Sequence, residues 1–266
     1  MNKDLISVLN LGYVYLFWYN CSMNLIICMA GLNTRFHDFG FDIPKYLLPW
    51  GDKTIITEIL SQIIKDYSFN QIILLANKRD IYFKETLLKS IYELKLDESN
   101  IFYINDTNGQ AHTASIGAGL CNDKSVPFCV HNADTIITNR DFNNIKLSLK
   151  NNQAFIDVFV ANSPSYCYVR FEKDKVLEIS EKVQNSPFAS SGLYCFQTTD
   201  MYLDAYYKIS EIQKSKEIYI SNLMQQMLNN GDKICSNSLN NQSETIVLGS
   251  PQEYSLELVK KSLNIK

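Results

Sequence analysis

The sequence predicts a single α/β domain in which a mixed β-sheet is flanked by helices. From Met23 onward, short apolar runs alternate with longer amphipathic segments, a pattern typical of strands and helices in a layered sheet. Of the 266 residues, 46% are hydrophobic and 20% charged, a balance typical of a folded globular protein. Neither an internal repeat nor a Pro/Gly-rich linker divides the chain. We therefore expect one domain over 23–266, preceded by an extension over 1–22.

The first half of the domain alternates strand and helix. In TIITEILSQIIKDY, apolar residues recur three and four positions apart, which predicts an amphipathic helix. The run QIILLAN is short and rich in branched apolar residues, which predicts a strand. By the same criteria, the predicted strands are 24–30, 71–77, 100–106 and 126–134, and the predicted helices are 54–67, 82–96 and 113–121.

The alternation changes after Asp134. Segments 153–162, 166–182 and 190–198 predict strands of mixed or antiparallel pairing. The polar residues EKDK at 172–175 predict a hairpin turn within the second of them. A helical stretch is expected from about 201 to 229.

The first 22 residues fit the domain poorly. Their apolar part, from Leu5 to Tyr19, is interrupted by Asn10 and is shorter than the ~20 residues that a membrane-spanning helix needs. It also has no net positive start and no small-residue cleavage site of the kind found in signal peptides. We expect an accessory helix or an upstream extension, and contact with a membrane surface through Trp18 is the less favoured alternative.

Charge and cysteine content narrow the possible partners. A net charge of −3 offers no broad basic surface, which disfavours nucleic acid as a partner, so any anion must be bound locally. The seven cysteines are scattered through apolar, strand-like runs without a C-x-x-C pair or a His/Cys cluster. This pattern predicts reduced core cysteines in a cytoplasmic protein and argues against a structural zinc site.

The stretch MAGLNTRFHDFGFDIPKYLLP, residues 29–49, predicts a phosphate-binding loop. Without a Cβ at Gly31, an anion can approach the backbone N–H groups that follow the first strand. Thr34 adds a hydroxyl, Arg35 a planar fork suited to phosphate oxygens, and Lys45 a mobile point charge. The loop matches neither the Walker A pattern nor the dinucleotide fingerprint. Chance occurrence is the alternative, and Pro44 could simply shape the loop.

Three further segments contain candidate functional residues. Asp134 follows a buried strand, at the edge where open α/β sheets bind ligands, and its carboxylate suits Mg²⁺, although it could instead cap a turn. Gly109 and Gln110, in NGQAHTA, could contact a base edge or form an ordinary helix cap. Glu181 and Lys182 precede a Ser-Ser-Gly turn, and the alternative for this lysine is a solvated surface position.

Taken in order, these segments resemble the nucleoside-triphosphate transferase family of sugar-phosphate nucleotidyltransferases. The resemblance rests on MAGLNTRF with PKYLLP, NGQAHTA, HNADTI, and EK followed by SSGLYCF. EIYISNLMQQMLNNG and GSPQEY are similar to later segments of the family, so the resemblance extends from Met23 to about Tyr254. It implies a Rossmann-like mixed α/β fold.

The resemblance also implies a reaction and a role for each candidate residue. A phosphorylated substrate would attack the α-phosphorus of a nucleoside triphosphate and release pyrophosphate, with Mg²⁺ as cofactor. The implied catalytic residues are Arg35, Lys45 and Lys182; the nucleotide-binding residues are Ala30, Gly31, Thr34, Gly109 and Gln110; the substrate-binding residues are Glu181 and Gly192; and the metal ligand is Asp134.

Two positions depart from the family pattern. Many members have a second metal-binding aspartate two residues before the glycine of the G-[ST]-P segment, where this chain has Val247. A carboxylate from elsewhere, a water-coordinated metal or weak catalysis would each account for this difference. Asn33 replaces the second glycine of the signature, and asparagine tolerates left-handed backbone better than most residues.

By the same resemblance, we expect an enzyme that makes an activated precursor for capsule or lipopolysaccharide synthesis. A pyrimidine nucleotide is favoured from the short NGQA segment, and a sugar phosphate or a phosphorylated alcohol is the expected acceptor. A homo-oligomer is possible. The alternatives are a non-catalytic nucleotide-binding regulatory module, suggested by Val247, and a membrane-associated scaffold, suggested by residues 1–22.

Overall fold

The structure is a computed structural model that describes residues 22–213, 217–236 and 244–265, so nearly all of the predicted extension lies outside it. Its strands are β1 Asn24–Cys28, β2 Pro49–Trp50, β3 Lys53–Thr54, β4 Gln71–Asn77, β5 Ile101–Ile104, β6 Phe128–Asn132, β7 Thr135–Ile137, β8 Ala154–Val160, β9 Cys167–Glu172, β10 Lys175–Glu181, β11 Phe188–Phe196, β12 Ile234–Cys235 and β13 Thr245–Val247. The helices are α2 Thr34–Asp38, α3 Ile55–Ile64, α4 Lys84–Tyr92, α5 Gln110–Leu120, α6 Phe142–Ser148, α7 Thr199–Ile212, α8 Ile220–Asn229 and α9 Pro251–Ser262, with 3-10 turns η1 Lys45–Leu47, η2 Lys78–Phe83 and η3 Glu98–Asn100.

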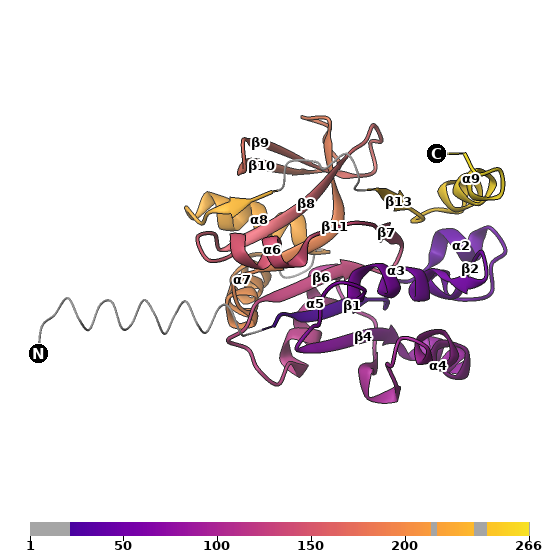
Figure 1. Cartoon of the computed structure of the whole chain (residues 1–266). Coiled ribbons are helices and arrows are strands. Elements are labelled where there is room, and N and C mark those ends of the chain that lie inside the picture. Colours follow the sequence, from indigo (N-terminus) through magenta and orange to yellow (C-terminus); the bar gives the residue numbers. More distant parts are fainter. Residues whose placement is uncertain (1–21, 214–216, 237–243, 266) are drawn as a thin grey trace, which may run out of the picture.

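A mixed nine-stranded sheet forms the centre of the molecule, in the order β5-β4-β1-β6-β11-β8-β12-β10-β9 (Figure 1). Strands β5, β4, β1 and β6 run parallel, and β11 pairs antiparallel with both β6 and β8. The sheet confirms the predicted Rossmann-like mixed α/β fold.

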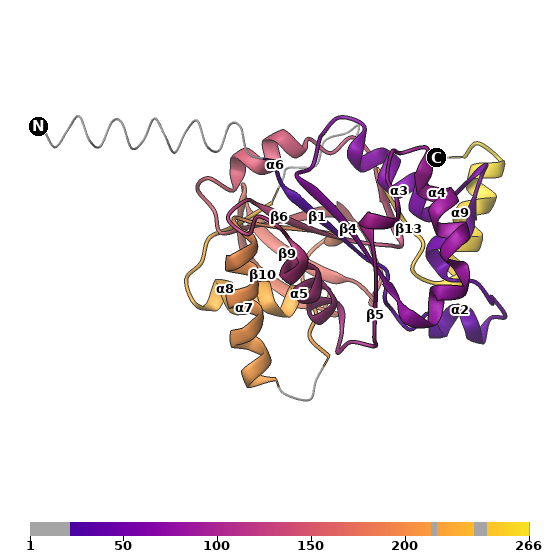
Figure 2. The same cartoon turned by 90° about the horizontal axis from the view of Figure 1, so that it is seen from below.

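Helices cover both faces of the sheet because alternate residues of each central strand point to opposite sides. In β1, Leu25 and Ile27 join one buried cluster with side chains of α3, α4, α6 and α9. The intervening Ile26 joins a second cluster with side chains of α5, α7 and α8. Figure 2 shows α3, α4 and α9 gathered on one side of the strands and α5, α7 and α8 on the other.

The strand register brings the loops after β1 and β6 to one edge of the sheet. Cys28, the last residue of β1, pairs with Leu75 on one side and Asn132 on the other. The loop that begins at Met29 therefore lies beside the turn that contains Asp134. This edge is the carboxyl end of the parallel strands, where α/β sheets bind ligands.

The structure confirms one predicted turn and differs from the sequence prediction in several other elements. The predicted hairpin at 172–175 is confirmed, since Glu172 pairs with Lys175. The continuous helix expected from 201 to 229 was wrong, because residues 217–219 are not helical and lie against the start of α5. There, Ile218 N–H donates to Asn108 O at 3.2 Å and Ala111 N–H donates to Ile218 O at 3.1 Å. The short elements α2, β7, α6, β12 and β13, and the helix α9, were not predicted.

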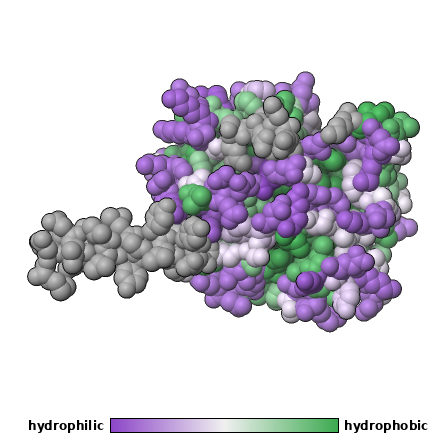
Figure 3. Space-filling model, in the orientation of Figure 1, coloured by the Kyte–Doolittle hydropathy of each residue, from purple (hydrophilic) through white to green (hydrophobic). Residues whose placement is uncertain are grey.

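The molecular surface is mainly polar on the face in Figure 3. An apolar strip gathers over α9, where Leu256, Val259 and Leu263 are more than half exposed. In the part of the chain that the structure describes, no helix combines the length and hydropathy needed to cross a bilayer.

Candidate active site

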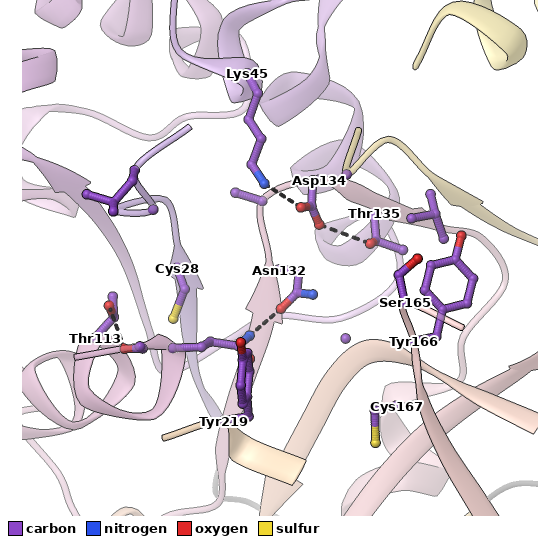
Figure 4. Close-up of a pocket in the computed structure, with 18 of the residues that line it drawn as sticks. Cys28, Lys45, Thr113, Asn132, Asp134, Thr135, Ser165, Tyr166, Cys167 and Tyr219 are labelled. Carbon is purple, nitrogen blue, oxygen red and sulfur yellow. Dashed lines mark hydrogen bonds and ion pairs between the residues drawn. The ribbon is translucent and has the colours of Figure 1, made fainter. Parts of the chain in front are cut away.

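A cleft of about 700 Å³ lies at the carboxyl edge of the parallel strands, and Figure 4 shows part of its lining. All of the predicted site residues line it: Ala30, Gly31, Thr34, Arg35, Lys45, Gly109, Gln110, Asp134, Glu181, Lys182 and Gly192. The fold therefore brings into one place residues that are up to 162 positions apart in the sequence.

The predicted phosphate loop leaves open space in front of its glycine. A Cβ added at Gly31 would have no other atom within 4 Å. Asn33 adopts the left-handed backbone conformation, with φ at 58°, and α2 begins at the next residue, Thr34. Thr34 and Arg35 are exposed, whereas Phe36 is buried and fixes the short helix to the core. The loop can thus present backbone, hydroxyl and guanidinium groups to a ligand.

Lys45 and Asp134 form an ion pair across the cleft. The Lys45 Nζ to Asp134 Oδ2 distance is 2.5 Å, and the two side chains are 26% and 17% exposed (Figure 4). Lys45 begins η1, which is held in place by the buried Tyr46 and Leu47. Burial opposes ionisation of Asp134, but the Lys45 ammonium outweighs it and lowers the pKa of this carboxyl below its usual value. Asp134 is therefore a carboxylate at neutral pH.

Gly109 is required by the packing of the chain at the mouth of the cleft. Its φ is 94°, and an added Cβ would lie 2.6 Å from Glu217 Cγ and 2.8 Å from Ile218 O. The Gln110 side chain donates a hydrogen bond to Asn132 Oδ1 on the neighbouring strand β6. The helix-cap alternative for this segment therefore has a structural basis, since α5 begins at Gln110, while both residues still line the cleft.

Lys182 belongs to a polar cluster with an aromatic ring. Its Nζ donates to the Tyr219 hydroxyl at 3.0 Å and lies 4.7 Å from the centre of that ring. The hydrogen bond to Tyr219 is the main reason that the pKa of Lys182 is raised. Its φ is 58°, an uncommon conformation for a lysine. Nearby, Glu181 Oε2 accepts a hydrogen bond from the Ser221 hydroxyl at 2.6 Å.

Gly192 sits where the pairing of β11 with β8 is irregular, between Ser190 and Tyr194. Its φ is 85°, and an added Cβ would lie 2.6 Å from Asn132 Cγ. Any side chain here would displace Asn132 and, through it, Gln110. This glycine keeps the floor of the cleft open.

The sequence matches the family model "Nucleotidyl transferase" over residues 24–242, which is most of the chain. The chain belongs to the nucleotidyl transferase family. A search of curated proteins found no match.

Solved structures of nucleotidyl transferases and pyrophosphorylases share the fold. A nucleoside-diphosphate-sugar pyrophosphorylase from Vibrio cholerae RC9 superposes with a TM-score of 0.76 at 24% identity, covering 88% of this chain and 99% of that one. A putative glucose-1-phosphate thymidylyltransferase from Bacillus anthracis has a TM-score of 0.72 at 18% identity, with 92% and 97% covered. The inositol-1-phosphate CTP transferase from T. maritima has a TM-score of 0.67 at 12% identity, with 91% and 96% covered.

For a nucleotidyl transferase, the thiols that line the cleft are poor nucleophiles. Burial raises the pKa of Cys28 to about 12, and burial also raises the pKa of Cys167. Both thiols are therefore protonated at neutral pH, which disfavours covalent catalysis by cysteine. The six described cysteines are free, and all except Cys28 are buried, as predicted.

Asp134 offers carboxylate oxygens, the kind of ligand that Mg²⁺ prefers, and its Oδ2 is paired with the Lys45 ammonium in this structure. The Thr135 hydroxyl lies 3.2 Å from Asp134 Oδ1, and Val247 is paired with Thr135 through strands β13 and β7. Within the described residues, no group of three or more His, Cys, Asp and Glu side chains could hold a metal ion. The residues present fit Mg²⁺ if substrate phosphates or water complete its coordination.

Several side chains that line the cleft were not predicted from the sequence: Asn132, Tyr166, Glu217, Tyr219, Ser221 and Glu253. Tyr219 lies in a segment that resembles the family, but nothing in that segment indicates that it meets Lys182. Glu253 follows Ser250 by three positions, which is the spacing of a helix capping box and could have predicted the start of α9.

Proposed function

We propose that this nucleotidyl transferase moves a nucleoside monophosphate from a nucleoside triphosphate to a sugar phosphate or a phosphorylated alcohol. The main support is that the open loop at Gly31, the Lys45–Asp134 pair and the Lys182 cluster line one cleft. In Figure 4, Lys45 lies at the top of the view and Tyr219 lies below it. The cleft that both residues line has a volume of about 700 Å³, which supports room for two phosphorylated substrates.

In this proposal, an acceptor phosphate oxygen attacks the α-phosphorus of the triphosphate. The bond between the α-phosphorus and its bridging oxygen breaks, and pyrophosphate leaves with the electron pair. The phosphate nucleophile is already ionised at neutral pH, so the reaction depends mainly on positioning and on charge neutralisation.

In this proposal, each charged residue of the cleft binds a different phosphate group. Arg35 would bind the leaving β- and γ-phosphates, since its guanidinium has no ion-pair partner among the described residues. Lys45 would bind the α-phosphate, and Lys182 the acceptor phosphate. Bound at Asp134, Mg²⁺ would supply additional positive charge to the phosphates.

The nature of the substrates is also part of the proposal. The names of the two transferases above refer to CTP and to thymidylyl transfer, and a further structural neighbour is a UDP-glucose pyrophosphorylase complexed with UDP-glucose. Cytosine, thymine and uracil are all pyrimidine bases. Together with the short NGQA segment, they support a pyrimidine triphosphate. We further propose a cytoplasmic role in making activated precursors for surface polysaccharides.

The direct test is pyrophosphate release from CTP, UTP, dTTP, GTP and ATP, each paired with sugar 1-phosphates and with phosphorylated alcohols, with and without Mg²⁺. We expect one metal-dependent pair to dominate, with a pyrimidine base. Release that needs no acceptor phosphate would contradict a transferase of this type.

Val247 favours a second candidate, a regulatory module that binds nucleotides without catalysis. This candidate predicts nucleotide binding, measured by calorimetry, with no pyrophosphate release for any pair. Turnover with any acceptor would exclude it.

A further inference from the structure

Glu253 is the carboxylate that the fold places beside Asp134. A Cβ added at Gly249 would lie 3.4 Å from Asp134 Oδ2 and 3.5 Å from Glu253 Oε2, so the two oxygens border the same small space. Both residues line the cleft. Burial raises the pKa of the Tyr166 hydroxyl, and its hydrogen bond to Glu253 raises it further. Asp134 adds a smaller increase, so both carboxylates act on this hydroxyl.

Strand pairing and a helix start explain this placement. Strand β13 runs antiparallel to β7, and Leu248 N–H donates to Asp134 O at 2.7 Å. Ser250 then caps α9, and Glu253 lies one turn inside the helix. Helical side chains point toward the N-terminus of their helix, which directs this carboxylate back to the cleft.

We propose that Glu253 supplies the second carboxylate of the Mg²⁺ site, in place of the residue at position 247. This inference rests on the proposed function. Val247 is paired with Thr135, and its side chain has no oxygen that could bind a metal. Glu253, in the first turn of α9, has a carboxylate. A pair of carboxylates, directly or through water, is typical of Mg²⁺ sites that also bind substrate phosphates.

The existing hydrogen bonds of Glu253 leave room for a metal. Its Oε1 accepts from Tyr166 at 2.6 Å and its Oε2 accepts from Ser250 at 2.8 Å. Each carboxylate oxygen has a further lone pair. The alternative is that Glu253 only caps α9, so a test must remove the charge and preserve the cap.

Glu253→Gln meets this requirement, because it removes the charge, leaves the backbone N–H that donates to the Ser250 hydroxyl, and keeps a side-chain oxygen that can accept from Ser250. Glu257→Gln is the matched control on the same helix, since Glu257 pairs with Lys260 and does not line the cleft. The probe is Mn²⁺ alone, followed by electron paramagnetic resonance, with thermal unfolding to verify the fold. We expect Glu253→Gln to weaken Mn²⁺ binding roughly tenfold or more, a size typical of lost metal-site contacts, and Glu257→Gln to bind as the wild type does.

A rescue variant separates charge from capping. Adding Val247→Asp to Glu253→Gln should restore most of the Mn²⁺ affinity, because the carboxylate returns beside Asp134. Wild-type binding by Glu253→Gln, or no Mn²⁺ binding by the unmodified protein, would overturn the inference.

Pyrophosphate release by the unmodified protein tests the proposed function independently. Mn²⁺ binding that depends on Glu253, without turnover, would support the metal site and contradict the proposed transferase activity. Turnover by the unmodified protein, together with wild-type Mn²⁺ binding by Glu253→Gln, would support the transferase activity and contradict the proposed role of Glu253.

Discussion

At the scale of single residues, Lys45 is the cation nearest the predicted metal ligand, 2.5 Å from Asp134. We expect Lys45→Ala to lower kcat about 10²-fold or more, because a charge contact made in the transition state is lost. Pyrophosphate release measures this effect. Lys53→Ala is the control, since Lys53 pairs with Glu58 at 3.6 Å and does not line the cleft. Equal activity of the two variants would contradict the role of Lys45.

His131 makes the stability of the protein depend on pH. Its ring is fully buried and its Nε2 donates to Thr135 O at 2.8 Å. Burial lowers the pKa of His131 from 6.5 to about 4; Asp134 opposes the shift and Arg140 adds to it. The unfolded chain therefore binds this proton more readily than the folded one as the pH falls.

The contribution of His131 is complete above pH 6.5 and is lost between pH 6.5 and about 4. We expect the free energy of unfolding to fall by about 3 kcal/mol over this range on account of this residue. Urea titrations at several pH values measure it. His131→Gln should show a shallower pH dependence in the same window, and parallel curves for the two proteins would contradict the assignment.

At the scale of elements, a buried ion pair joins the loop after β7 to β8 and β13. Arg140 Nε contacts both oxygens of Asp157, at 2.9 Å and 3.0 Å, and these side chains are 4% and 2% exposed. Arg140 Nη2 also donates to the Thr245 hydroxyl of β13 at 2.7 Å. This pair fixes the strand that leads to α9 and hence to Glu253.

Removing one partner of this pair should destabilise the fold strongly. We expect Asp157→Asn to lower the free energy of unfolding by about 3–5 kcal/mol, because the guanidinium is left buried without its counter-charge. Glu178→Gln is the contrast: its pair with Arg170 is 51% and 41% exposed, and such pairs contribute under about 1 kcal/mol. Chemical denaturation compares the two, and similar losses would contradict the structural role of the buried pair.

At the scale of the whole molecule, we predict that activity does not depend on the first 22 residues. The family match begins at residue 24, and among the described residues the lining of the cleft begins at Cys28. We therefore expect a chain that begins at Met23 to retain the wild-type kcat and the same solubility. Pyrophosphate release measures kcat, and sedimentation measures solubility. Loss of activity would contradict this prediction and indicate a role for the extension.

The sequence by itself determined the features that depend on local chemistry. Alternating periodicity predicted the longer strands and most helices. Residue types in the loop at Gly31 and the turn at Asp134 predicted candidate site residues, all of which line one cleft. Short elements such as α2 escaped prediction, since five residues with one buried side chain give no period.

Only the tertiary structure decided which distant residues became neighbours. Pairing of β13 with β7 brings Glu253 beside Asp134, and packing of residues 217–219 against the start of α5 brings Tyr219 to Lys182. These contacts join segments far apart in the chain, so no local pattern encodes them. They follow from strand pairing and helix packing, which bury apolar surface and satisfy backbone hydrogen bonds over the whole molecule at once.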